Sequence, residues 1–128
     1  MTIQYTIDTV VGVVRVEMRG AVDADQTVRF IERLATDDAL RPAMPQLIEL
    51  TRADAPPTAL EVERVAQAFA RLRPSFEGAR CAVVVADPVM YGAIRQFASL
   101  AARAMIDVRP FLDAREARRW LGLPEDFQ

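Results

Sequence analysis

The sequence contains no histidine, no lysine and only one cysteine, Cys81. Histidine is the commonest general base and metal ligand in proteins, and without it a Ser–His or Cys–His nucleophile cannot form. A single cysteine cannot form an internal disulfide bond, and its place in an apolar run indicates a small core residue rather than a nucleophile. No G-x-G-x-x-G or phosphate-loop motif follows any predicted strand. We therefore expect a protein without enzymatic activity, catalytic residues, cofactor or bound metal.

The chain also lacks a strong net charge and a long apolar segment. Its formal net charge is −2, which gives no electrostatic reason to bind nucleic acid or anionic membranes. It has no signal peptide and no apolar run of membrane-spanning length, so we expect a cytoplasmic protein that does not insert into membranes. With 128 residues, 52% of them hydrophobic, the chain is expected to form a single domain over residues 1–128.

The most informative stretch that is present begins with an unbroken apolar run, residues 81–86. A strand covered on one face alternates apolar and polar residues, and this run does not, which indicates an interior strand of a parallel sheet. Asp87 and Pro88 then suit the N-cap and the first position of a helix. Gly92 lies on the polar side of that helix and is expected to allow close packing of another backbone. The apolar stripe of the helix is expected to be Met90, Ile94, Phe97 and Ala101.

Two alternating segments, residues 3–7 and 14–18, open the chain, and the short link between them predicts an antiparallel hairpin. Pro110 removes a hydrogen-bond donor from the last predicted strand, which places that strand at an edge. The other elements are expected at residues 23–35 (helix), 46–50 (strand), 58–72 (helix), 106–112 (strand) and 113–121 (helix). The order β-β-α-β-α-β-α-β-α predicts an α/β domain with a mixed, mostly parallel five-stranded sheet and four helices.

Polar residues follow the strands at the edge of the predicted sheet where parallel sheets usually bind ligands. These residues are Asp23, Arg52, Asp54, Thr58, Asp87 and Asp113. One interpretation is an acidic cluster that binds a hard cation such as magnesium. The other is that Asp23, Thr58, Asp87 and Asp113 each cap a helix, and we favour it because Asp and Thr are preferred caps.

A specific protein partner is expected to dock at this edge. Helix N-termini present unpaired amide hydrogens there, and Pro56 and Pro57 stiffen the loop before the next helix. The candidate contact residues are Arg52, Asp54, Thr58, Asp87 and Tyr91. For Tyr91 the simpler alternative is a packing residue with its hydroxyl in water. A homodimer is also expected, because exposed edge strands must be protected or paired and two-fold dimers are the commonest oligomers.

Three segments carry a resemblance to a known bacterial family. They are residues 47–54 (LIELTRAD), 81–101 (CAVVVADPVMYGAIRQFASLA) and 106–122 (IDVRPFLDAREARRWLG). With the order of elements, they resemble the small SpoIIAA-like domains of STAS/SEC14 type over nearly the whole chain. The resemblance implies a sheet flanked by helices, with the fold of anti-sigma-factor antagonists, and no established enzymatic activity.

The resemblance also implies a function. Anti-sigma-factor antagonists carry a phosphorylated serine at the helix after the third strand, where this chain has residues 55–60 and Thr58 is the one residue able to accept phosphate. A phosphate there would meet a helix N-terminus and could recruit Arg52. The function implied is a regulatory or protein-interaction module. The alternative is a small SEC14-type protein that binds an apolar or lipid-like ligand between helices and sheet, suggested by Met90, Ile94, Phe97, Met105 and Phe111.

Overall fold

The computed structural model describes residues 1–127, so the last residue of the predicted domain, Gln128, lies outside the described part. The strands are β1 (Thr2–Asp8), β2 (Val13–Gly20), β3 (Gln46–Ala53), β4 (Arg80–Val84) and β5 (Asp107–Phe111). The helices are α1 (Ala24–Ala35), α2 (Ala59–Arg71), α3 (Arg73–Phe76), α4 (Pro88–Ala101) and α5 (Ala114–Trp120), with a 3₁₀ turn at Ala102–Ala104. The predicted class and order are confirmed, with the four-residue helix α3 added between α2 and β4.

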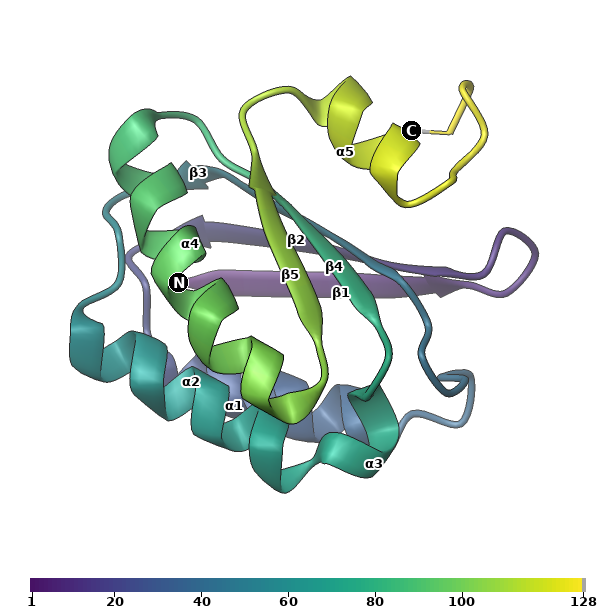
Figure 1. Cartoon of the computed structure of the whole chain (residues 1–128), viewed down its shortest axis with the longest axis horizontal. Coiled ribbons are helices and arrows are strands. Elements are labelled where there is room, and N and C mark those ends of the chain that lie inside the picture. Colours follow the sequence, from purple (N-terminus) through teal and green to yellow (C-terminus); the bar gives the residue numbers. More distant parts are fainter. Residues whose placement is uncertain (128) are drawn as a thin grey trace.

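The five strands lie in the order β1-β2-β3-β4-β5 (Figure 1). β1 and β2 pair antiparallel, and every later pair is parallel. β4 lies between two parallel neighbours, as its apolar run predicts, and β5 forms one edge with Pro110 opposite Val83. None of the helices described for residues 1–127 has the length and hydropathy that a membrane span requires.

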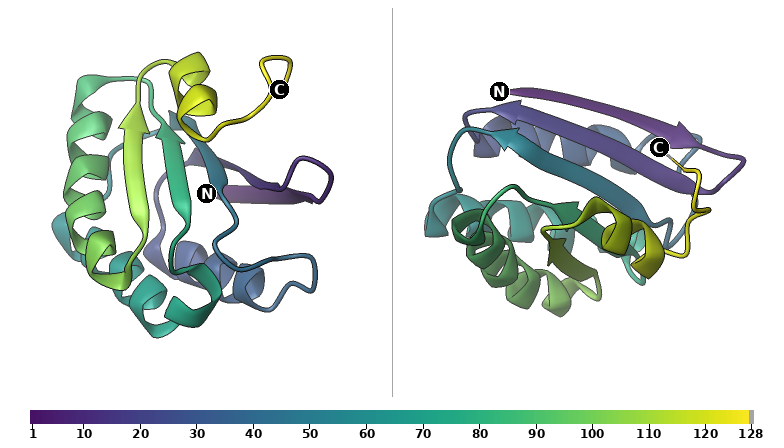
Figure 2. Two further views of the ribbon diagram at one scale, coloured as in Figure 1. Left: turned by 45° about the vertical axis from the view of Figure 1, so that its right-hand side comes forward. Right: turned by 90° about the horizontal axis from the view of Figure 1, so that it is seen from above.

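Helices cover the two faces of the sheet unequally (Figure 2). Helices α1, α2 and α4 lie on one face over the main core, and α5 covers part of the other face. The position of β4 explains why its apolar and polar residues do not alternate. Cys81 and Val83 face the main core, whereas Ala82 and Val84 face a second cluster with Ala117 of α5. The parallel strands all end at one side of the molecule, at the left of Figure 1, where α2 and α4 begin.

One row of paired residues crosses four strands on the side of α1, α2 and α4. Gln46 of β3 pairs with Val14 of β2 and with Cys81 of β4, and Cys81 pairs with Val108 of β5. Paired residues on neighbouring strands point to the same face of a sheet. Because Val14, Cys81 and Val108 belong to the main core, the side chain of Gln46 points there too.

The structure contradicts the expected role of Gly92. A Cβ atom at this position would meet no atom within 4 Å, because Gly92 lies on the exposed side of α4 rather than against another backbone. The glycine therefore increases the conformational entropy of the unfolded chain, and no packing contact in the folded state offsets this loss of stability.

Gly92→Ala is accordingly expected to raise the free energy of unfolding by about 1 kcal/mol, measured by urea denaturation. The matched control is Gly122→Ala, which also has open space around the added methyl group but has a φ of +72°. Alanine is strained in that left-handed conformation, so the control is expected to lower stability. Equal effects of the two substitutions would contradict the expectation.

Candidate functional site

Four of the six polar residues expected to follow the strands are helix caps. Asp23 accepts hydrogen bonds from the backbone N–H groups of Asp25 and Gln26 at the start of α1. The carboxylate of Asp87 accepts from the Met90 N–H (2.9 Å) at α4, and that of Asp113 accepts from the Arg115 N–H at α5. At α2, Thr58 and Glu61 form a complete capping box. These bonds confirm the capping interpretation. As a separate observation, residues 1–127 contain no group of three or more acidic or cysteine side chains placed to hold a metal ion.

The predicted docking residues lie at the end of the sheet where α2 and α4 begin. Arg52, Asp54, Thr58 and Asp87 are exposed, and Tyr91 is half-buried against the main core. The backbone N–H of Asp54 donates to the Gly20 carbonyl, which ties this loop to β2. In the described part of the chain, the one hydrogen bond between two of the five is the helical bond from the Tyr91 N–H to the Asp87 carbonyl (3.0 Å).

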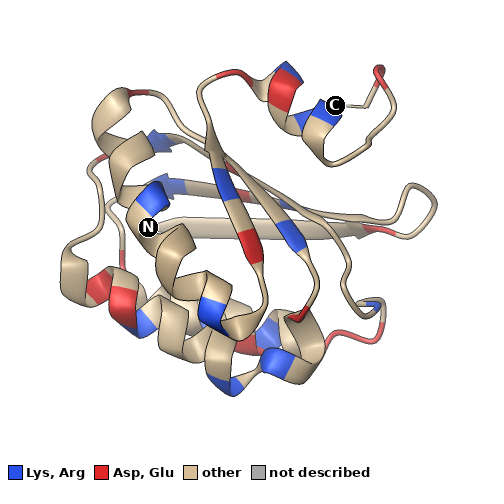
Figure 3. Ribbon diagram, in the orientation of Figure 1, with Lys and Arg blue, Asp and Glu red and all other residues tan. Residues whose placement is uncertain are grey.

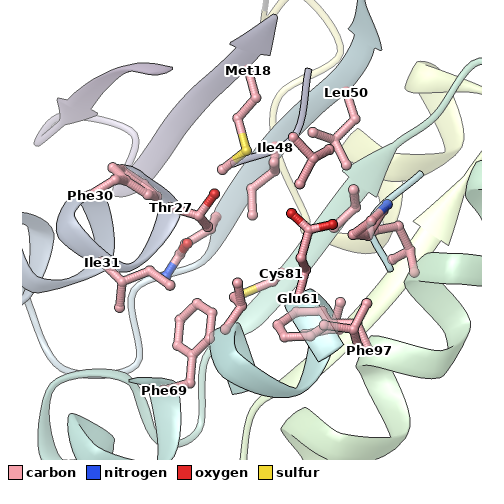
Figure 4. A pocket seen from close by; sticks show the side chains of 18 of the residues that line it. Met18, Thr27, Phe30, Ile31, Ile48, Leu50, Glu61, Phe69, Cys81 and Phe97 are labelled. Atoms are coloured by element: carbon pink, nitrogen blue, oxygen red, sulfur yellow. The ribbon is translucent and has the colours of Figure 1, made fainter. Parts of the chain in front are cut away.

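A cavity of about 100 Å³ lies between the sheet and helices α1, α2 and α4. Figure 4 shows Ile31, Phe69 and Phe97, one from each of these helices, pointing into a common space beside Cys81. Its partly exposed lining residues include Pro57 and Glu61 from the segment after β3, so the cavity opens beside the start of α2.

The prediction of which apolar residues form a ligand site is only partly correct. Ile94 and Phe97 line the cavity. Met105 does not, because it is 58% exposed after the 3₁₀ turn, and Phe111 packs against Trp120 on the opposite face of the sheet. Met90 is buried in the main core without lining the cavity.

Among residues 1–127, Gln46 is the polar residue of the cavity lining whose side chain has no hydrogen-bond partner. It is 1% exposed, and neither its side-chain nitrogen nor its side-chain oxygen has a hydrogen-bond partner among residues 1–127. Thr27, also in the lining, is satisfied because its hydroxyl donates to the Asp23 carbonyl (2.9 Å). One feature of the sequence marks this residue, because a glutamine stands at the start of a strand segment before Leu47 and Ile48.

Cys81 is a core residue, as predicted. Burial, with a smaller contribution from the charge of Asp107, raises the pKa of its thiol to about 12. The thiolate is the reactive form of cysteine, so a thiol with this pKa stays protonated and unreactive at neutral pH.

Comparison with known proteins shows the fold. No protein-family model and no curated protein sequence matches the chain. Among solved structures, an uncharacterised DUF3478-family protein with a SpoIIAA-like fold from Shewanella loihica PV-4 superposes with a TM-score of 0.61. The two share 17% identity over 94% of this chain and 92% of that one. This chain has a SpoIIAA-like fold. An anti-sigma factor antagonist from Mycobacterium paratuberculosis is also similar, with a TM-score of 0.56 and 17% identity over 94% of this chain and 95% of that one.

Within this SpoIIAA-like fold, the structure does not bring Arg52 to Thr58. Arg52 stands opposite Arg19 of β2, after a register irregularity in the β2–β3 pair. A hydrogen bond from Arg19 lowers the pKa of Glu17, and the charge of Arg52 adds to this effect, so Arg52 lies near Glu17. The charged group that is hydrogen-bonded to Thr58 is the carboxylate of Glu61, which accepts from the Thr58 N–H at 3.0 Å.

Two apolar residues at this end of the SpoIIAA-like fold were not predicted as site residues. Leu60 is the second residue of α2 and Val89 the second residue of α4, and each is 68% exposed. Figure 3 shows that the start of α4 carries no charged residue after its capping aspartate. The sequence signal was that both residues follow a cap by two positions and fall outside the apolar stripe of their helix.

Proposed function

We propose that the protein is a non-enzymatic regulatory module of the cytoplasm that binds a protein partner at the docking edge. The docking edge comprises the predicted residues Arg52, Asp54, Thr58, Asp87 and Tyr91, with Leu60 and Val89 added. The observation that carries the proposal is the exposure of Leu60 and Val89 at the starts of two capped helices. Large apolar side chains held on rigid elements are typical anchors of protein interfaces.

The fold supports the same function. One solved structure similar to this chain is an anti-sigma factor antagonist, a regulatory protein. The docking edge also supplies polar groups near the two apolar anchors, because the exposed Thr58 and Asp87 cap the helices that carry them and the exposed Asp54 directly follows β3. An apolar centre with a polar rim is the usual anatomy of an interface.

The double variant Leu60→Ser with Val89→Ser is expected to reduce partner recovery at least about ten-fold, because each exposed apolar anchor contributes about 1 kcal/mol or more. The measurement is a quantitative pull-down from extract of the organism's own cells. The control is Val10→Ser, which removes an apolar side chain that is 95% exposed in the β1–β2 hairpin, at the opposite end. The melting temperatures of all three proteins should agree. Equal recovery by both variants would overturn the docking edge.

Thr58→Asp and Arg52→Ala test the polar part of the docking edge. Aspartate retains a side-chain acceptor for the Glu61 N–H, so Thr58→Asp is expected to leave the melting temperature unchanged within about 2 °C. The added charge lies beside the Glu61 carboxylate and is expected to change partner affinity. If both variants bind the partner as the unsubstituted protein does, these polar residues are structural only.

We also propose that two copies pair through β1. Pro110 blunts the β5 edge, whereas the seven residues of β1 form an unblunted edge at the other side of the sheet. Light scattering at high micromolar concentration should give the mass of a dimer, and a monomer mass there would end this proposal.

A further inference from the structure

We propose that the free edge of β1, together with the side of α1 beside it, binds an extended segment of a partner protein that carries acidic side chains at alternate positions. The segment would lie next to β1 as an added strand of the sheet. This surface is separate from the docking edge, because none of the residues of that edge lines the hollow between β1 and α1. The proposal therefore does not depend on binding at the docking edge.

The backbone of β1 offers hydrogen-bonding groups that no other described strand uses. In the neighbouring strand, the Val14 N–H donates to the Pro45 carbonyl, so the backbone groups of Val14 point toward β3. Because the backbone groups of successive strand residues point to opposite sides, Val13 and every second residue after it bond to β1. Their partners in β1 are Thr2, Gln4, Thr6 and Asp8. The residues between these partners therefore point their N–H and C=O groups away from the sheet, and they are Ile3, Tyr5 and Ile7.

This edge lacks the features that usually prevent a free strand from pairing. β1 is the outermost strand, and no other strand lies beyond it among residues 1–127 (Figure 2). Native edges are commonly blunted by proline, by charged residues or by a bulge. β1 contains no proline, its first charged residue is Asp8 at its end, and it pairs with β2 without a register shift. The edge is therefore suited to pairing with one more strand.

The acidic residues of α1 are engaged within the protein. Asp25 forms an ion pair with Arg64 of α2, and Glu32 forms one with Arg71 of the same helix. The hydrogen bond from Arg64 is the main cause of the lowered pKa of Asp25, and the charge of Arg29 contributes less. The negative charges of α1 are thus matched by cations of α2.

The basic residues of α1 lie beside β1 and remain available. Arg29 and Arg33 line a hollow of about 150 Å³ whose lining also includes Ile3 and Tyr5 of β1. Both arginines are exposed, and neither forms an ion pair within residues 1–127. Two unpaired guanidinium groups one helical turn apart, next to a free strand edge, favour carboxylate side chains on the added strand.

The floor of the hollow is formed before a segment binds. The ring of Tyr5 packs against that of Phe30 with 5.5 Å between centroids, and its hydroxyl donates to Asp37 at 2.8 Å. The other carboxylate oxygen of Asp37 accepts from the Ala39 N–H at 3.0 Å, so both oxygens are engaged. Preformed walls reduce the ordering cost of binding.

Strand pairing determines which side chains of the segment reach the arginines. Paired residues of neighbouring strands point to the same face of a sheet, and Ile3 and Tyr5 pack toward the main core and α1. Every second residue of the segment therefore faces Arg29 and Arg33. The residues between them face the open side of the sheet, beside the exposed Gln4 and Thr6. Acidic residues that alternate with β-branched residues fit this arrangement.

The proposed pairing of two copies uses the same edge, so the segment and the second copy exclude each other. A second copy paired antiparallel through β1 would bring its own α1, with two further arginines, to the same face of the sheet. Like charges facing each other oppose association. The acidic segment is the better complement and is expected to displace the second copy.

The test measures binding of the full chain to a fluorescein-labelled peptide of eight residues in which glutamate and threonine alternate. The matched control peptide has glutamine in place of every glutamate. The glutamate peptide is expected to bind at least about five-fold more tightly at low salt, the factor that corresponds to two exposed ion pairs. Equal affinities of the two peptides, or binding of neither, would overturn the proposal.

The double variant Arg29→Gln with Arg33→Gln provides the second arm. In this variant the ratio of the two peptide affinities is expected to fall from about five to about one. The control is Arg115→Gln with Arg119→Gln, which removes two exposed arginines at the same spacing from α5 and should leave the ratio unchanged. All four positions are exposed, so both variants should fold. An equal fall in both variants would show a general effect of charge and contradict the assigned site.

Hydrogen exchange followed by NMR locates the bound segment. The glutamate peptide should slow exchange of the amide hydrogens of Ile3, Tyr5 and Ile7, which are free in the unbound edge, and leave those of Gln4 and Thr6 unchanged. Light scattering of the complex should give the mass of one chain with one peptide. Slowed exchange at the docking edge instead of β1, or a dimer mass with peptide bound, would overturn the proposal.

Discussion

Phe76→Ala is expected to lower the free energy of unfolding by about 3–5 kcal/mol, the range measured when a buried phenylalanine is truncated. Phe76 is 1% exposed, and its ring packs edge-on against Phe69 with 5.2 Å between ring centroids. The loss would remove a large share of the stability of a domain of this size. Guanidinium denaturation, with the change in slope monitored, measures it.

The control for this prediction is Phe127→Ala, which makes the same change at a half-buried residue near the end of the chain. Phe127 contributes a cation–π contact with Arg15 (5.2 Å to the ring centroid), which is worth about 1 kcal/mol at an exposed site. Its removal should therefore cost much less than removal of Phe76. A similar cost for the two variants would show that α3 does not anchor the core.

Gln46→Met is expected to raise the free energy of unfolding of the ligand-free protein by about 1–3 kcal/mol, the cost of burying an amide without a hydrogen-bond partner. The substitution conserves the size of the side chain, so no packing loss offsets the gain. Thermal and urea unfolding both measure it. This outcome would identify Gln46 as a residue that lowers the stability of the fold.

The control for Gln46→Met is Gln67→Met, the same change at an exposed position of α2. A surface substitution of this kind should alter stability by about 0.5 kcal/mol or less. If Gln46→Met instead lowers stability well below the level of the control, then the Gln46 amide has a hydrogen-bond partner in solution, and the expectation fails.

Local signals predicted the elements of the sheet well, because each depends on residues close in sequence. The apolar run at β4 indicated cover on both faces, and the two clusters on either side of β4 confirm it. Helix α3 was missed because the helix predicted at residues 58–72 is followed by Pro74, and helices usually end before a proline. Proline is also tolerated in the first turn of a new helix. The contact between Phe76 and Phe69 that makes this helix part of the core is visible only in three dimensions.

The site was less predictable than the fold for a physical reason. The strand 46–50 was expected, but the face to which Gln46 points depends on its register with β2 and β4, which the sequence does not specify. The absence of a partner for its amide depends on every side chain around the cavity. The residues of the docking edge were predicted from topology, and their role in binding stays a prediction.

Glu61 takes part in both the helix cap of α2 and the wall of the cavity. Its carboxylate accepts the Thr58 N–H in the capping box that begins α2, and its side chain also lines the cavity that contains Gln46. A change of packing in the cavity that shifts this carboxylate would change the first turn of α2, which carries the exposed side chain of Leu60. Packing around the cavity and the position of Leu60 would then be coupled, and by thermodynamic reciprocity any contact that fixes Leu60 would also favour one arrangement of the cavity wall.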